Sequence, residues 1–109
     1  MPTETWKSFE RAVAKHFGGT RVGGFGDNAV RQSCDVYTDT LLIECKLRKE
    51  WPTPKQIETW YNTVEERARK ENKAGILCIK VGGCHGFWVV ENFGLGLIMQ
   101  HSSWAGETE

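Results

Sequence analysis

Apolar side chains near the start of the chain recur at the spacing of an α-helix. The recurring positions are Trp6, Phe9, Val13 and Phe17. Thr3 precedes them as an N-cap residue, and Gly18-Gly19 follows them as a helix stop. This pattern predicts a first helix over residues 4–17.

A second helical pattern begins at Thr53. This residue is followed by Pro54 at the first helical position and by Gln56 three residues after the cap, which is a capping-box arrangement. The apolar face of the segment continues through Ile57, Trp60, Tyr61, Val64 and Ala68. The polar residues 70–73 end it, so the sequence predicts a second helix before them.

The remaining apolar runs are short and predict strands. Residues 33–38 and 41–47 predict a β-hairpin that turns at Asp39-Thr40, and two later runs, 74–81 and 86–91, predict further strands.

Glycine-rich segments lie between and after these runs. Residues 18–32 predict a short strand at 20–22 and then a mobile loop, whereas 93–100 give no clear assignment and the tail from 101 to 109 is expected to be flexible. The order is therefore α-β-β-β-α-β with one further strand, in a single α/β domain spanning residues 1–109, with helices flanking a mixed central sheet.

The two-residue turn fixes the register of the predicted hairpin. Val36 then lies opposite Ile43, and Asp35 lies opposite Glu44. Because side chains alternate along a strand, two faces follow. One face carries Cys34, Val36, Leu41, Ile43 and Cys45, and the other carries Asp35, Tyr37, Leu42, Glu44 and Lys46. The charged groups are thus predicted to meet on one side of the sheet, at its end.

Composition limits the possible functions without selecting one. The chain has 14 Lys and Arg against 14 Asp and Glu, so any contact with nucleic acid must depend on a local basic patch. No apolar run is long enough to span a membrane and no signal peptide is evident, so a cytoplasmic protein is expected. The four cysteines form no CxxC pair, which favours reduced, structural thiols. A zinc site that combines Cys78, Cys84 and His85 with Cys34 or Cys45 is the less favoured alternative.

Asp35, Glu44 and Lys46 are the residues with the clearest chemical potential. Mg²⁺ prefers oxygen ligands and needs only one or two carboxylates when phosphate supplies the rest. A lysine on the same face can stabilise charge that develops on a phosphodiester. The alternative is an ordinary Glu-Lys pair on a solvated strand.

Glu10 adds a possible third carboxylate, because it lies within the apolar stripe of the first helix. A buried carboxylate requires a partner or a metal. Two interpretations stay open: Glu10 points into the protein, or it lies at the margin of the stripe and pairs with Lys7 or Arg11 in solvent.

Together, Glu10, Asp35 and the segment Ile43-Glu44-Cys45-Lys46 resemble the PD-(D/E)xK nuclease superfamily, and within it the small Holliday-junction-resolvase-like members. The resemblance covers residues 6–65, although Cys34 stands where the motif has proline. It implies a restriction-endonuclease-like core and a Mg²⁺-dependent DNA endonuclease, with Mn²⁺ able to substitute. Glu10, Asp35, Glu44 and the Cys45 carbonyl would surround the metal, and Lys46 would assist the attacking water.

Several other residues are candidates for binding DNA. They are Arg21, Arg31, Arg48, Lys49, Lys55 and Gln56. A homodimer is expected because so small a domain offers little surface for a duplex, with Phe87, Trp88 and 95–99 as candidate interface. Trp51-Pro52 either stacks on a base or braces the following helix, and a non-cleaving nucleic-acid-binding module is the alternative function.

Overall fold

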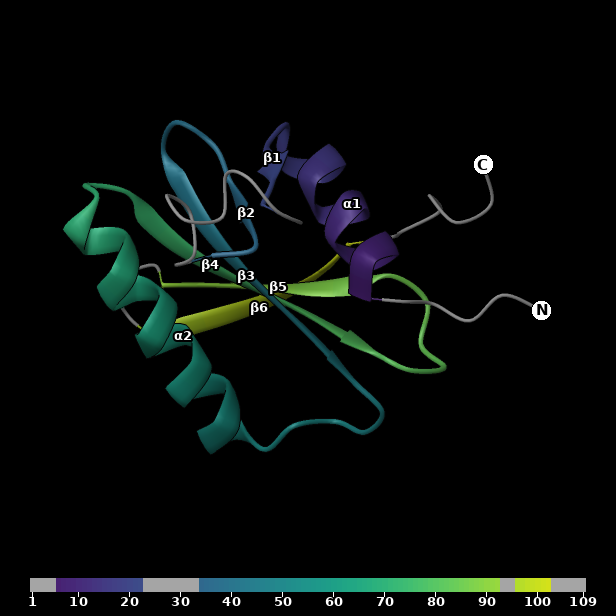
Figure 1. The fold of residues 1–109 in the computed structure, drawn as a ribbon. Helices are drawn as coiled ribbons and strands as arrows, with labels where there is room; N and C mark the ends of the chain where they lie inside the picture. The colour runs from purple at the N-terminus through teal and green to yellow at the C-terminus, as the bar shows by residue number, and fades with distance from the viewer. Residues whose placement is uncertain (1–5, 23–33, 93–95, 103–109) are drawn as a thin grey trace.

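The computed structural model describes residues 6–22, 34–92 and 96–102, and within them two helices and six strands form one α/β unit (Figure 1). The helices are α1 (Trp6–Phe17) and α2 (Pro54–Lys70). The strands are β1 (Thr20–Arg21), β2 (Val36–Tyr37), β3 (Leu41–Arg48), β4 (Ala74–Val81), β5 (Phe87–Asn92) and β6 (Leu97–Ser102).

The six strands form one sheet in the order β1-β2-β3-β4-β5-β6. The neighbours β3 and β4 run parallel, and α2 connects them, as a parallel crossover requires. The other four neighbouring pairs are antiparallel. The mixed sheet flanked by helices and the order α-β-β-β-α-β, both predicted from the sequence, are therefore confirmed.

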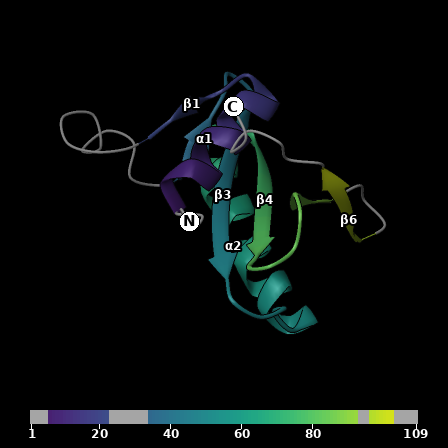
Figure 2. The ribbon, with the colours of Figure 1, turned by 90° about the vertical axis from the view of Figure 1, so that its right-hand side faces the viewer.

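The two helices cover opposite faces of the sheet, as the turned view shows (Figure 2). Under α1, Phe9 and Val13 pack on Val36 and Ile43, and Phe87 lies 5.7 Å from the Phe9 ring. Under α2 the core consists of Tyr61, Val64 and Ala68 against the other side of the strands, which includes Leu42, Leu77 and Ile79. Because β3 is covered on both sides, its alternating side chains enter two different cores.

The start of α2 agrees with its sequence signature. The Thr53 side chain accepts a hydrogen bond from the Gln56 amide at 3.1 Å, and Gln56 Oε1 accepts one from the Thr53 amide at 2.9 Å. This closed capping box satisfies two of the otherwise unpaired amides of the first turn. The predicted boundary of the second helix at Thr53 is confirmed.

Several predictions from the sequence differ from the structure or concern residues outside the described ranges. Cys34 packs in the core under α2 and not with Val36 under α1, because the chain bends at Asp35 before β2 begins. The strand β6 occupies part of the segment left unassigned, and it includes His101 and Ser102, which were expected to belong to the flexible tail. The proposed N-cap Thr3 and the glycine-rich segment 23–33 lie outside the described residues. The helices of the described part include none that is long and apolar enough to cross a membrane.

Gly75 lets α2 approach β4 closely, and its replacement gives a first prediction. A Cβ atom at this position would stand 2.8 Å from the Glu65 Cα and 3.0 Å from the Glu65 amide nitrogen, both backbone atoms of α2. Gly75→Ala should therefore push the helix off the sheet and lower the free energy of unfolding by about 1–3 kcal/mol, measurable by urea denaturation. Gly83→Ala is a useful comparison, because a methyl group there would meet no atom of the described residues within 4 Å and only its positive φ is strained.

Candidate metal-binding site

The β2–β3 hairpin brings the candidate acidic residues together. Val36 pairs with Ile43 and Tyr37 with Leu42, so the predicted register is confirmed. The turn is stabilised by the Thr38 hydroxyl, which accepts hydrogen bonds from the amides of Thr40 and Leu41 at 3.1 and 2.9 Å. A short side-chain acceptor is what such a tight turn requires.

Asp35 lies directly before β2 and is held by three hydrogen bonds. Its amide donates to the Ile43 carbonyl at 3.0 Å, and its carbonyl accepts from the Val22 amide at 2.8 Å. Its carboxylate accepts a hydrogen bond from the Cys45 amide at 2.8 Å. The side chain thus supplies the acceptor that a longer β2 would have supplied from its backbone, and the Cys45 amide is paired although β2 has ended.

Glu44 lies on the α2 side of β3 between two cations. Its carboxylate oxygens are 3.6 Å from Lys46 Nζ and 3.8 Å from Arg67 Nη1. The pKa of Glu44 is raised, mainly by burial and next by the negative charge of Asp35, although Lys46 and Arg67 oppose the rise. Arg67 was not among the residues predicted from the sequence, since only the packing of α2 on the sheet brings it here.

Glu10 points into the protein from α1. It is 5% exposed, and its Oε1 accepts a hydrogen bond from Arg21 Nε at 2.9 Å. The pKa of Glu10 is raised to about 7, because burial and the charge of Asp35 outweigh the effect of Arg21. Of the two interpretations, the structure shows the buried one, with a partner from β1 and not the solvent-exposed pairing with Lys7 or Arg11.

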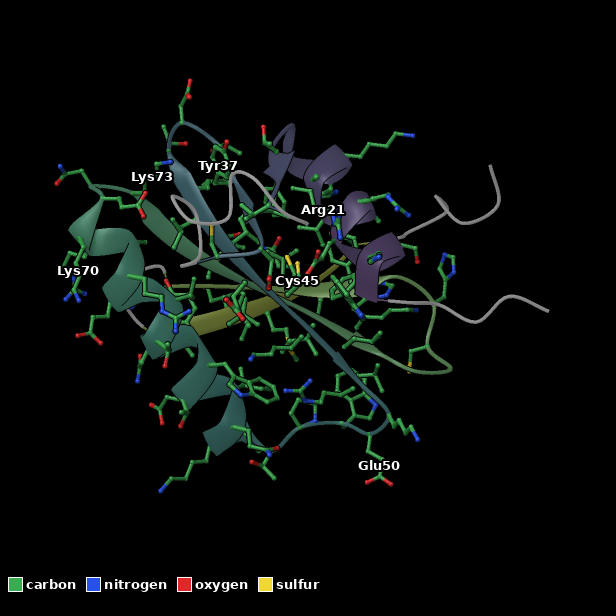
Figure 3. The ribbon with its side chains drawn as sticks, viewed as in Figure 1. Arg21, Tyr37, Cys45, Glu50, Lys70 and Lys73 are labelled. Carbon is green, nitrogen blue, oxygen red and sulfur yellow. The ribbon has the colours of Figure 1, made fainter. Side chains whose placement is uncertain are left out.

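Asp35 links the two other acids. Its charge raises the pKa of both Glu10 and Glu44, and all three carboxylates raise the pKa of the Cys45 thiol, after burial and the Cys78 thiol. Figure 3 shows Cys45 near the middle of the sheet, with Arg21 lying against α1. In residues 6–22, 34–92 and 96–102, however, no three His, Cys, Asp or Glu side chains are gathered closely enough to enclose a metal by themselves. Asp35 acts electrostatically on Glu10, which comes from α1, and on Glu44, which lies on the α2 side of the sheet.

The carboxylates around Asp35 can supply part of the ligand set of a hard divalent cation. The pKa values of Glu10 and Glu44 are raised first by burial and next by the charge of Asp35, and a bound cation would oppose both effects. Mg²⁺ usually keeps several waters and takes one or two carboxylates, so the paired oxygens of Asp35 with Glu10 or Glu44 are a sufficient donor set.

The location of these residues along β3 differs from the prediction. Glu44 was expected at the end of its strand, but β3 continues for four residues beyond it to Arg48. The acids gather at the middle of β3 because β2 contains only two residues and exposes the edge of β3 from that point. The glycine-rich segment that was expected to cover the site lies outside the described residues.

The basic residues predicted to bind DNA lie in three different places. Arg48 and Lys49 line a cavity of about 370 Å³ at the end of β3, together with Gln56. Lys55 lines a separate cavity of about 640 Å³ beside the exposed apolar residues of β6. Arg21 is held by Glu10 on the α1 side, and Arg31 is outside the described residues. The described members of this predicted set therefore do not share one cavity.

Trp60 of α2 contacts two cationic side chains, which its position in the apolar face of the helix did not predict. Its ring lies beneath two cations, with Lys46 Nζ at 5.5 Å and Arg48 Cζ at 4.8 Å from the ring centroid. Contacts of this kind favour one orientation of a cationic side chain. One feature of the sequence could have indicated these contacts: Lys46 and Arg48 are two positions apart on β3, on the face that α2 covers.

All four cysteines are free thiols. Cys34 and Cys78 are buried, and burial raises the pKa of the Cys78 and Cys45 thiols above the ordinary range. Thiols of this kind stay protonated and pack as small apolar groups, which agrees with the structural role predicted for them.

Comparisons with known proteins add one similarity in fold. No protein-family model matches the sequence. No curated protein matches it either. Among solved structures, the chain is similar to Hjc, a Holliday junction resolvase from the archaeal hyperthermophile Archaeoglobus fulgidus, with 19% identity over 88% of each chain and a TM-score of 0.48. Values this low do not transfer the residues of that protein to this chain.

Proposed function

We propose that this protein is a metal-dependent endonuclease that hydrolyses DNA phosphodiester bonds, as the resemblance of its motifs to the PD-(D/E)xK nucleases implies. The observation that carries the proposal is the sharing of Asp35 between Glu10 and Glu44, with raised pKa values for both partners. Clustered acids with raised pKa values beside an open strand edge are typical of functional sites.

The residues divide the expected work among them. Asp35 with Glu10 or Glu44, and the Cys45 carbonyl, would hold Mg²⁺, with Mn²⁺ able to substitute. A bound cation of this type lowers the pKa of a coordinated water and neutralises phosphate charge. Lys46, held beside Glu44 and over Trp60, donates hydrogen bonds to a phosphate oxygen or to the attacking water as charge develops.

The proposed substrate is DNA, and the narrower proposal is branched DNA of the Holliday-junction type. A homodimer would supply two such sites. Of the candidate interface, Phe87 is wrong, because it is 1% exposed and belongs to the core under α1. Leu97, Ile98 and Met99 are 36–43% exposed on the edge strand β6 and are the better candidates.

A second candidate function is DNA binding without cleavage. One specific observation favours it: the carboxylates already have cationic partners, with Glu10 held by Arg21 at 2.9 Å and Glu44 placed between Lys46 and Arg67. Internal ion pairs can neutralise acids that a cation would otherwise neutralise.

Cleavage of labelled linear duplex, single-stranded, flap and four-way-junction DNA in Mg²⁺, Mn²⁺ or EDTA distinguishes the two functions. We expect cleavage in Mg²⁺ and Mn²⁺ and none in EDTA. The matched control is Asp35→Asn, whose amide oxygen still accepts the Cys45 hydrogen bond while the charge is gone, so it should fold and fail to cleave. Cleavage that survives EDTA or this substitution contradicts the proposed metal-dependent mechanism. Binding without any cleavage supports the second function.

A further inference from the structure

The cavity at the end of β3 has the composition of a nucleobase site. Its volume of about 370 Å³ is at the lower end of the range for small-molecule sites, which suits one planar group. Two tryptophans, two cations and the capping-box glutamine surround it. The lining residues are Arg48, Lys49, Glu50, Trp51, Pro52, Gln56 and Trp60.

Trp51 is the exposed wall of this cavity. It is 50% exposed, so a large part of its surface stays accessible to a ligand. Its contact with Trp88 is edge-on, with centroids 5.5 Å apart and an interplanar angle of 62°. A contact at this angle involves at most one face of the Trp51 ring and leaves the other outside the Trp51–Trp88 pair. The sequence left open whether Trp51 stacks on a base or braces the turn, and the exposure favours stacking.

Trp60 and Arg48 also line the cavity. The guanidinium of Arg48 lies over the Trp60 ring at 4.8 Å, and its Nη1 donates to the Leu47 carbonyl at 2.9 Å. A guanidinium held in this way presents a planar cation to the cavity, which is a surface on which bases stack. Figure 3 shows the carboxylate of Glu50, which also lines the cavity, directed away from the sheet.

The cavity adjoins the candidate metal site through one shared ring. Trp60 lies under both Arg48, which lines the cavity, and Lys46, whose Nζ is 3.6 Å from Glu44. Lys46 and Arg48 are two positions apart on β3 and so project on the same side of the sheet. A DNA strand with a phosphate at Lys46 therefore brings a neighbouring base to the mouth of the cavity.

We propose that this cavity holds one unpaired nucleobase of a DNA strand, stacked on Trp51 and bounded by Arg48 and Trp60. The proposal rests on the proposed function for DNA as the class of ligand, and it favours DNA with an unpaired base near the bound phosphate over a fully paired branched DNA. A base within a continuous duplex would first have to be unpaired and unstacked, which costs free energy that an unpaired base does not require.

Binding to three matched DNAs tests the proposal without any cleavage. The ligands are a continuous duplex, the same duplex with one bulged nucleotide, and that bulge with an abasic residue. Affinities are measured in EDTA by fluorescence anisotropy. We expect the wild-type protein to bind the bulged base about tenfold more tightly than the abasic bulge, the size of one stacking interaction.

Substitutions then show whether Trp51 is responsible for the preference for the bulged base. Trp51→Ala should remove it, and Trp51→Phe, which keeps a ring, should restore part of it. Trp6→Ala is the matched control, since Trp6 is 54% exposed on α1 and lies outside the cavity, so the ratio of the two affinities should not change.

Three results would overturn the proposal. They are equal affinity of the wild-type protein for both bulges, a preference that survives Trp51→Ala, and a preference that Trp6→Ala also removes. Because neither metal nor cleavage enters the measurement, failure here leaves the nuclease itself intact. Conversely, a preference for the bulged base without any DNA cleavage would contradict only the proposed nuclease activity.

Discussion

Lys46→Ala should lower the rate of DNA cleavage about 100- to 1,000-fold while leaving the fold unchanged. Removal of a single group that stabilises developing charge in a hydrolytic site typically has this effect. Lys46 contacts a candidate metal ligand, at 3.6 Å from Glu44, and projects from β3 beside it. Its side chain is 25% exposed, and an ion pair with that access to water contributes at most about 1 kcal/mol to stability. The unfolding midpoint should therefore change little.

The control for this prediction is Lys70→Ala. Lys70 is the last residue of α2, at the opposite end of that helix from the loop that carries Glu50 (Figure 3). Single-turnover rates at saturating Mg²⁺ compare the two variants, with circular dichroism as the check of fold. If Lys46→Ala and Lys70→Ala cleave at the same rate, the role assigned to Lys46 is wrong. If Lys46→Ala unfolds instead, the ion pair between Lys46 and Glu44 contributes more to stability than its exposure indicates.

The sequence was sufficient to predict the hairpin that carries Asp35 and Glu44. A two-residue turn at Asp39-Thr40 allows one register, and the alternation of side chains follows from it, so the pairing of Val36 with Ile43 could be stated in advance. The capping box at Thr53 was equally local. These features depend on residues only a few positions apart, which is where sequence patterns are most informative.

The surroundings of the acids were less predictable, because they depend on packing between distant segments. Arg21 reaches Glu10 across eleven positions, and Arg67 reaches Glu44 from the far half of α2. The face of Cys34 was predicted wrongly because the bend at Asp35 interrupts the alternation that the strand pattern assumed. The position of the acids at the middle of β3 depends on how short β2 is, and strand ends are set by tertiary packing as much as by local sequence.

In the absence of divalent cations, the protein should lose stability as the pH rises from about 4.5 to 7. Glu10 has a pKa of about 7 in the folded protein against 4.5 for an ordinary glutamate, so in this interval the folded state binds more protons than the unfolded state. By linkage, the free energy of unfolding falls with rising pH across the interval and is constant above it with respect to this group. A shift of this size corresponds to about 3 kcal/mol. Glu44, whose pKa is also raised, acts in the same direction.

Glu10→Gln should remove the contribution of Glu10 to this slope. The amide does not titrate, and its oxygen can still accept the hydrogen bond from Arg21, so the variant should be more stable than the wild-type protein at pH 8 and similar to it below pH 4.5. Urea denaturation at several pH values in EDTA measures the difference. Glu58→Gln, an exposed change on α2, is the control and should keep the wild-type slope.

Adding Mg²⁺ or Mn²⁺ at pH 8 should stabilise the wild-type protein more than it stabilises Glu10→Gln. A cation that binds only the folded state stabilises it in proportion to the logarithm of its concentration over its dissociation constant. The ionised Glu10 of the wild-type protein pairs with Asp35 to favour that binding, whereas the neutral amide of Glu10→Gln does not. Equal stabilisation of both proteins by the cation would mean that Glu10 is no ligand and that its burial serves only the ion pair with Arg21. Because burial raises the pKa of Glu10 and a cation lowers it, the pH at which Mg²⁺ begins to stabilise the protein should itself fall as its concentration rises.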